Sequence, residues 1–207
     1  ATVLLGANGA GKSTFVRILA GELLADSGQI TVAGHALGTD QAIAALIHVA
    51  QSPPLAEFLT TNEHAEALAD LRRRSLVDVQ TELRAAAEQL ALGDHLDRPI
   101  LALSGGMRQK AALCLAFASG CQTLLLDEPY TGLDIRSAHA LRGLIAAKRD
   151  AGGALLIASH LAESALAVAD RAVVLSGGCI ALDLDKDALA DFGGDPRAFE
   201  AAVLTVM

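Results

Sequence analysis

The sequence predicts an α/β protein in which helices cover a mostly parallel β-sheet and an α-helical subdomain is inserted into the α/β core. One observation is a set of short runs that are apolar throughout, which is typical of strands buried on both faces. Another is that helical patterns separate these runs, as in a chain that alternates strands and helices. The apolar runs are Val3–Leu5, Leu46–Val49, Leu124–Leu126, Leu155–Ala158 and Val173–Leu175.

Two segments follow the i, i+3, i+4 and i+7 spacing of one helix face, the second with small slippage. We therefore expect each of them to form a helix. The tail from Asp183 reads as a short turn followed by one or two helices. The two helical sets are Leu141, Leu144, Ile145 and Lys148, and Val79, Leu83, Ala87 and Leu90.

The stretch from about Ser52 to Leu103 interrupts the alternation. It opens with Pro53–Pro54 and then shows helical patterns without a convincing strand. We therefore expect a single domain over residues 1–207. Residues 1–51 and 108–207 are expected to form a RecA-like α/β core, and residues 52–107 the helical subdomain.

The composition of the 207 residues indicates a folded protein without a membrane span of its own. Hydrophobic residues make up 52% and charged residues 19%, which excludes a disordered tail. The longest uncharged stretch lies between Lys110 and Asp127, and it is shorter than the roughly 20 apolar residues of a spanning helix. No signal-like start is visible. Membrane contact is therefore expected only through a partner.

The charge pattern argues against a nucleic-acid partner. The net charge is -8, and the one basic run, Arg72–Arg74, is flanked by Asp70 and Asp78. A nucleic-acid binder usually shows a basic stripe, so we interpret this run as a solvated helix face. The three cysteines, Cys114, Cys121 and Cys179, match no metal or redox spacing and are expected to be buried thiols in a reducing compartment.

A glycine-rich segment near the start of the chain matches G-x-x-x-x-G-K-[ST], the phosphate-binding P-loop pattern, and it predicts that the α/β core is a P-loop NTPase core. Glycines allow backbone N–H groups to surround an anion, and the helix that starts here adds the positive end of its dipole. Lys12 is expected to neutralise the β- and γ-phosphates, and Ser13 to bind Mg²⁺. The alternative, an ordinary turn, is disfavoured by the strand and helix patterns on either side. The segment reads Gly6-Ala7-Asn8-Gly9-Ala10-Gly11-Lys12-Ser13.

Two carboxylates follow the apolar run Leu124–Leu126, where a buried strand is expected to end. Ligands of open α/β sheets gather at that edge. Successive residues alternate in direction, so Asp127 can face Mg²⁺ while Glu128 orients or deprotonates the attacking water. An acidic turn before Pro129 is the alternative, and the phosphate-binding pattern makes it the weaker one.

A family becomes recognisable at Leu103-Ser104-Gly105-Gly106-Met107. This segment resembles the LSGGQ signature of ABC ATPases, and it precedes a helical stretch (Arg108 to Ala118) that leads to Asp127, as in that family. Three more elements follow the family's order. Gln51 resembles the Q-loop glutamine, Gly132-Leu133-Asp134 the D-loop, and His160 the switch histidine.

The resemblance covers Thr2 to about Ile180, and it implies an Mg-dependent ATPase whose cofactors are ATP and Mg²⁺. In the family two such domains, identical or different, pair head to tail, and the signature of one closes on ATP held by the other. The resemblance also implies that the partners are integral membrane transporter subunits. It implies a cytoplasmic location, peripheral on the inner face of the cell membrane. The implied ATP-binding residues are Gly6, Ala7, Asn8, Gly9, Ala10, Gly11, Lys12, Ser13 and Thr14; the metal residues are Ser13, Gln51 and Asp127; the catalytic residues are Glu128, His160 and Gln51; the signature residues acting in trans are Ser104, Gly105 and Gly106; and the D-loop residue is Asp134.

The chain departs from the family in two places. Met107 stands where the signature has Gln. The signature followed by Arg108-Gln109-Lys110, together with Thr131-Gly132-Leu133-Asp134, looks most like exporter-type domains. The chain also begins at Ala1, without the earlier strands and adenine-stacking aromatic residue of the family. Tyr130, beside the carboxylates, cannot replace that residue. We expect a truncated chain, with ATP binding weakened by about one to two decades.

Two other functions stay open. The first is a soluble ABC-type ATPase of DNA repair or translation, although the segment between Gln51 and Leu103 leaves no room for a coiled coil and the charge is negative. The second is a truncated nucleotide-binding remnant without catalysis, which the start at Ala1 suggests.

Overall fold

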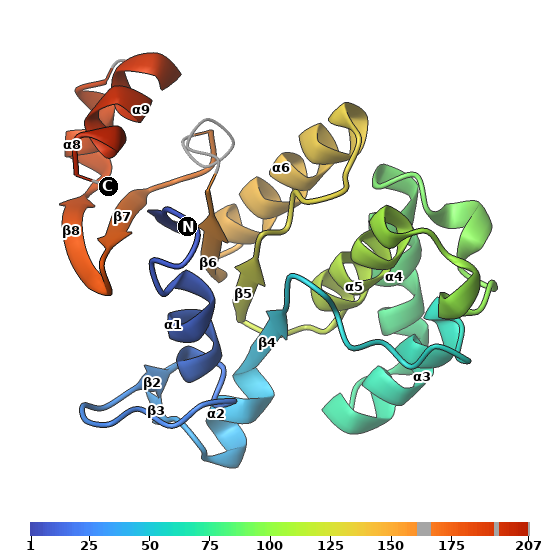
Figure 1. Cartoon of the computed structure of the whole chain (residues 1–207). Coiled ribbons are helices and arrows are strands. Elements are labelled where there is room, and N and C mark those ends of the chain that lie inside the picture. Colours follow the sequence, from blue (N-terminus) through green and yellow to red (C-terminus); the bar gives the residue numbers. More distant parts are fainter. Residues whose placement is uncertain (161–166, 193–194, 207) are drawn as a thin grey trace.

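A computed structural model describes residues 1–160, 167–192 and 195–206, and Figure 1 shows the arrangement. The main sheet has the strand order β4-β5-β6-β1-β7-β8, and β2 pairs with β3 in a separate small hairpin. All neighbours in the main sheet are parallel except β7 and β8, which are antiparallel. The strands are β1 (Thr2–Gly6), β2 (Thr31–Val32), β3 (His35–Ala36), β4 (Leu46–Val49), β5 (Thr123–Asp127), β6 (Ala154–Ser159), β7 (Arg171–Ser176) and β8 (Cys179–Leu184).

The five apolar runs of the sequence all lie in parallel strands, which confirms the α/β prediction. Helices flank the sheet on both faces, with α1 on one side and α5 and α6 on the other (Figure 1). The helices are α1 (Lys12–Leu19), α2 (Asp40–Ala45), α3 (Thr61–Arg72), α4 (Leu76–Gln89), α5 (Gly105–Ala118), α6 (Ile135–Asp150), α8 (Lys186–Ala190) and α9 (Pro196–Leu204), and short 3₁₀ turns cover Gly93–His95 and Ile100–Ala102.

Alternate residues of the strands enter two different cores. Leu4 of β1 packs with Val16 of α1, whereas Val3 and Leu5 belong to a larger core that includes Leu141 of α6. This is the result expected of period-2 side chains in a sheet covered on both faces. The sheet is therefore anchored on both sides, and its strand ends are held in fixed positions.

The segment after β4 is helical, as the sequence predicts. Residues 52–103 contain α3 and α4, and they contribute only an isolated β-bridge between Thr60 and Pro99. A capping box at Thr60 starts α3, with its hydroxyl accepting from Glu63 N at 3.1 Å and Glu63 accepting from Thr60 N at 2.7 Å. Both helices lie beside α5 (Figure 1). The domain boundaries stay a prediction, and α5 runs across the one expected after residue 107.

Two expectations about the periphery are wrong in detail, although the helices predicted for the tail are present as α8 and α9. Asp183 lies inside β8 and pairs with Arg171 at 2.6 Å, because Gly177 and Gly178 form a tight turn that returns the chain antiparallel to β7. Cys179 is exposed, whereas Cys114 and Cys121 are buried.

The basic run is also different from the solvated face we expected. Arg72 donates to the carbonyl oxygens of Ile43, Ala44 and Leu46 at 2.7–3.1 Å. These carbonyls lie at the end of α2 and the start of β4, so this side chain ties α3 to the α/β core. Arg74 pairs with Glu82 at 2.7 Å. Arg73 alone remains an exposed side chain of the expected kind.

Candidate functional site

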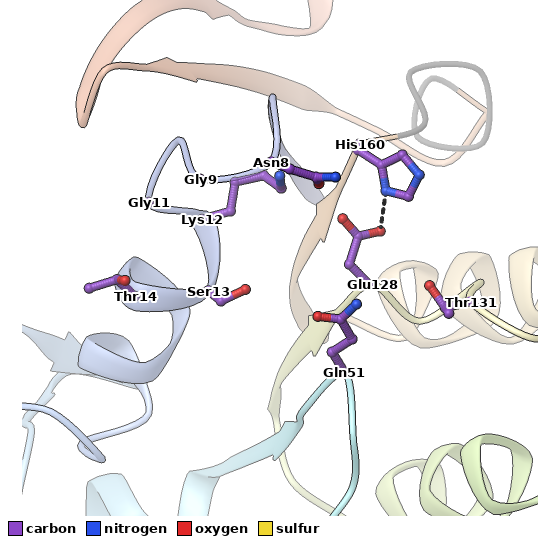
Figure 2. A pocket seen from close by; sticks show the side chains of 10 residues that line it. All are labelled: Asn8, Gly9, Gly11, Lys12, Ser13, Thr14, Gln51, Glu128, Thr131 and His160. Atoms are coloured by element: carbon purple, nitrogen blue, oxygen red, sulfur yellow. Dashed lines mark hydrogen bonds and ion pairs between the residues drawn. The ribbon is translucent and has the colours of Figure 1, made fainter. Parts of the chain in front are cut away.

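A cavity of about 510 Å³ opens at the carboxyl ends of the parallel strands. Figure 2 shows Gln51, Glu128 and His160 on one side of it, opposite the glycine-rich loop with Lys12 and Ser13. The three come from the ends of β4, β5 and β6, which are neighbours in the sheet. Parallel strands bring their carboxyl ends to one edge, and that is why residues far apart in sequence meet here.

The glycine-rich loop between β1 and α1 is built to approach an anion closely. Gly11, which precedes the first helical residue Lys12, has φ 101°. A residue with a Cβ adopts this left-handed conformation only with strain. The N-terminus of α1 then directs free backbone N–H groups and the positive end of the helix dipole into the cavity.

Lys12 already lies along this loop. Its Nζ donates to the carbonyl oxygens of Gly6 at 2.8 Å and Ala7 at 3.2 Å, and the residue is 6% exposed. Both of these partners are neutral, so neither opposes the attraction of the ammonium group for an anion that enters the loop. The cavity therefore has a positive wall, formed by one lysine and one helix N-terminus.

The opposite wall carries a carboxylate in a strained position. Glu128 follows the last residue of β5 and has φ 48°, which is uncommon for a residue with a Cβ. Its N–H donates to Ala158 O at 2.9 Å and so continues the sheet pairing for one more residue. Strain of this kind collects at functional sites, where the surrounding structure holds a side chain in one direction.

Two residues at the end of β6 contact this carboxylate. Nδ1 of His160 lies 2.9 Å from Oε2 of Glu128, and Ser159 Oγ donates to the same oxygen at 3.5 Å. A carboxylate oxygen at this distance is placed to accept a hydrogen bond from Nδ1. The Glu128 side chain is 9% exposed, whereas His160 is 48% exposed and forms part of the cavity rim.

Asp127 lies one residue earlier, on the last position of β5. It is 3% exposed, and Oδ1 is buried without a hydrogen-bond partner among the described residues. A buried oxygen of this kind costs free energy unless a donor or a cation satisfies it. Oxygen is also the ligand atom that Mg²⁺ prefers. The buried oxygen of Asp127 therefore fits a magnesium ion, and it lies one residue before Glu128, which lines the cavity.

The signature segment lies elsewhere. Ser104 is the N-cap of α5, and its Oγ accepts from Met107 N at 3.3 Å, so both glycines fall within the first turn of the helix. The helix thus begins three residues earlier than Arg108, where the sequence pattern placed its start. Ser104 and Gly105 are exposed, and their helix N-terminus is the second glycine-containing helix start among the predicted site residues.

The cavity brings together most of the residues that the sequence singled out. Its lining includes Thr131, which sequence reasoning missed, and Ser159 was missed as well. Each is adjacent to a motif, Thr131 in the turn after Glu128 and Ser159 directly before His160, and that adjacency was the available signal. The predicted residues in the lining are Asn8, Gly9, Gly11, Lys12, Ser13, Thr14, Gln51, Glu128 and His160; those outside it are Gly6, Ala7, Ala10, Ser104, Gly105, Gly106, Asp127 and Asp134.

Comparison with known families settles the membership of this chain. The family described as "ABC transporter" matches residues 1–131. The chain belongs to the ABC transporter family. It is an ATP-binding domain of that family, with the P-loop NTPase fold that the sequence predicted.

Individual relatives agree with this membership. The ABC domain is 33% identical over 179 residues to the cholesterol transporter ABCA5 of Mus musculus. The aligned region covers 84% of this chain and 11% of that protein. The chain thus spans about a tenth of the length of this curated relative. A solved ATP-binding subunit of an ABC transporter is 26% identical, with a TM-score of 0.88 and coverage of 99% of this chain and 86% of that one.

A second solved structure supports the fold alone, because its identity is 21%. It is a dimeric post-hydrolysis state of an ATP-binding cassette bound to ADP and Pi, with a TM-score of 0.79 over 89% of this chain and 84% of that one. In the described part of the ABC domain, every helix is too short or too polar to cross a membrane.

Proposed function

We propose that this ABC domain is a Mg-dependent ATPase subunit that drives membrane transport through ATP-dependent dimerisation. The observation that carries the proposal is that one chain has two separate helix N-termini suited to bind an anion, those of α1 and α5. The P-loop lines the cavity with Glu128 and His160, whereas Ser104–Gly106 lie outside that lining and are largely exposed. A second copy, or a related domain, can supply its signature to the nucleotide.

The P-loop side of the cavity binds the nucleotide. Residues 6–14 surround the phosphates with backbone N–H groups, and Lys12 moves from the carbonyls of Gly6 and Ala7 to the anionic oxygens. The oxygens of Ser13, Gln51 and Asp127 hold Mg²⁺, which supplies charge neutralisation at the phosphates when bound. Ser104–Gly106 of the partner copy close the site from the other side.

Glu128 acts on the attacking water. Its carboxylate accepts a proton as the water oxygen bonds to the γ-phosphorus, and the bond from that phosphorus to the bridging oxygen of ADP breaks. The products are ADP and inorganic phosphate. His160 directs the carboxylate through its 2.9 Å contact, and the buried position of Glu128 keeps the carboxylate in one orientation.

A groove suited to a membrane partner begins beside Gln51. This space of about 310 Å³ lies between the end of β4, the segment after it and α3, and its lining is mostly apolar. Because it borders the residue that reaches the cavity, a transporter segment seated there would sense the state of the nucleotide. The subunit would then lie on the inner face of the membrane. Its apolar lining includes Ile47, Val49, Pro53, Leu55, Leu68 and Leu71.

The test compares the ATPase activity of the parent chain with that of Glu128→Gln. Activity should fall by about 10²–10⁴-fold, and the variant should accumulate as an ATP-bound dimer in size-exclusion chromatography with light scattering. Glu66→Gln, an exposed position on α3, is the matched control and should behave as the parent. Equal activity in the parent and Glu128→Gln would remove Glu128 from the mechanism. If Glu128→Gln remains a monomer with Mg-ATP bound, the proposal of ATP-dependent dimerisation is wrong.

A further inference from the structure

The first turn of α5 is in direct backbone contact with the loop between β5 and α6. A Cβ on Gly106 would lie 2.3 Å from the carbonyl oxygen of Gly132, and a Cβ on Gly132 would lie 3.4 Å from the Cα of Gly106. Real Cβ atoms do not approach backbone oxygen as closely as 2.3 Å, so the two segments can touch in this way only because residue 106 is glycine. At residue 132 a Cβ would make an ordinary contact, and glycine is favoured there by its φ of 75°. The signature turn therefore packs on the loop that follows Glu128.

One turn further along α5, an ion pair joins the same two segments. Lys110 Nζ lies 2.9 Å from Oδ2 of Asp134, the N-cap of α6. The lysine side chain is 10% exposed and the aspartate side chain 60%. Gly106 and Lys110 are four positions apart, so they lie on one helix face. Both contacts to the loop thus come from the same side of α5.

Asp134 is fully engaged within its own chain. Oδ1 accepts from Ser137 N at 2.8 Å, and Oδ2 accepts from Lys110 Nζ and from Ser137 Oγ at 3.0 Å. The Ser137 N–H bond and the Lys110 contact hold the pKa of the Asp134 carboxyl well below its usual range. A carboxylate with this set of partners is an anchor for the two helix starts, rather than a group left free for a ligand.

We propose that Lys110 is a positioning residue, which with Asp134 fixes the signature turn of α5 against the loop after Glu128. This inference rests on the proposed function, in which Ser104–Gly106 meet the nucleotide of a partner copy. A binding surface made of backbone N–H groups works only if the helix start is held in place before the partner arrives. The Gly106–Gly132 contact provides the fit, and the ion pair keeps the two segments together.

The experiment uses the full chain in the Glu128→Gln background, with Mg-ATP, and compares Lys110→Met with Lys110→Arg. Met keeps the apolar stem and removes the charge, whereas Arg keeps the charge. Two quantities are measured: the affinity of the monomer for a fluorescent ATP analogue, and the dimer dissociation constant from light scattering. Lys148→Met, at the other end of α6, is the matched control.

Because a closed dimer contains two such pairs, we expect Lys110→Met to raise the dimer dissociation constant by about three- to thirtyfold. Monomer affinity for the analogue should change less than about twofold, because the P-loop is untouched, and Lys110→Arg should restore dimerisation. Asp134→Asn retains an N-cap acceptor and should also raise the dimer dissociation constant. This variant replaces Lys110→Met in the test if Lys110→Met does not fold.

Three results would overturn the inference: unchanged dimerisation in Lys110→Met and Asp134→Asn, no restoration by Lys110→Arg, or an equal loss of monomer affinity. Failure of the proposed function looks different, because the Glu128→Gln parent itself would then remain monomeric with Mg-ATP.

Discussion

Nδ1 of His160 lies 2.9 Å from Oε2 of Glu128, so the ends of two neighbouring parallel strands are joined by a side-chain contact at the cavity. Glu128 is buried and His160 is half exposed on the rim. The histidine thus orients the carboxylate from the solvent side, and the two residues should act as one unit.

His160→Ala should lower the ATPase rate constant by about 10²-fold, because the carboxylate loses the group that directs it. In the Glu128→Gln background the same change should cost little more, since its partner is already absent. Steady-state ATPase assays of the parent, both single variants and the double variant give the coupling. Losses that multiply in the double variant would show that His160 acts independently of Glu128.

The left-handed backbone at Glu128, with φ 48°, should be visible in stability. Glu128→Gly relieves the strain and Glu128→Ala keeps it, so the glycine variant should have the higher free energy of unfolding by about 0.5–1 kcal/mol. Urea unfolding of the two variants measures the difference. If the alanine variant is equally stable, the backbone at this position is not strained.

Gly106→Ala should lower the free energy of unfolding by about 1–3 kcal/mol, because its Cβ would meet the Gly132 carbonyl oxygen at 2.3 Å and one segment must shift. Gly105→Ala is the matched control, since its Cβ meets nothing within 4 Å. Its stability should remain within about 0.5 kcal/mol of the parent. Thermal or urea unfolding that gives the two variants equal stability would contradict the close contact between α5 and the loop.

Tyr130 is the single tyrosine of a chain without tryptophan, so its ionisation can be followed alone by ultraviolet absorbance. Burial raises its pKa to about 12 from the ordinary value of 10.0. The neutral phenol therefore contributes stability that is complete below about pH 10 and is lost as the pH rises through about 12. A folded-state titration near 10 would show that the phenol is exposed to water.

The hydroxyl of Tyr130 is buried without a hydrogen-bond partner among the described residues. Tyr130→Phe should therefore retain or raise the free energy of unfolding, by up to about 1 kcal/mol, and should remove the alkaline loss assigned to this group. Urea unfolding at neutral and alkaline pH checks both statements.

Arg72→Ala should lower the free energy of unfolding by about 1–3 kcal/mol, because three carbonyls at the α2–β4 junction lose their donor. Arg73→Ala removes an equal charge from an exposed neighbour and should change stability by less than about 0.5 kcal/mol. Equal effects of the two substitutions in urea unfolding would restore the interpretation of this run as a solvated face.

The sequence was sufficient for the elements whose signal is local. Apolar runs predicted the parallel strands, and the spacing of Val79, Leu83, Ala87 and Leu90 predicted α4. The first three residues lie in α4, Leu90 is its C-cap, and all four are buried. Local chemistry was less informative at turns and helix ends. The sequence analysis did not predict the antiparallel strand that follows the Gly177–Gly178 turn. It also placed the start of α5 too late, because Ser104 caps the helix and Gly105 is its first residue.

The residue types of the site could likewise be read from the chain, since a glycine-rich loop, a lysine and strand-end carboxylates each carry their chemistry in a few adjacent letters. Partners across the fold could not. The contacts of Arg72 with the α2–β4 carbonyls, of Gly106 with Gly132 and of Lys110 with Asp134 join segments at least 24 positions apart. The sequence by itself therefore determined which groups are candidates for binding phosphate and metal. Tertiary packing decided which of them meet at the cavity and which lie exposed outside it, because contact partners depend on how the sheet and helices assemble rather than on spacing along the chain.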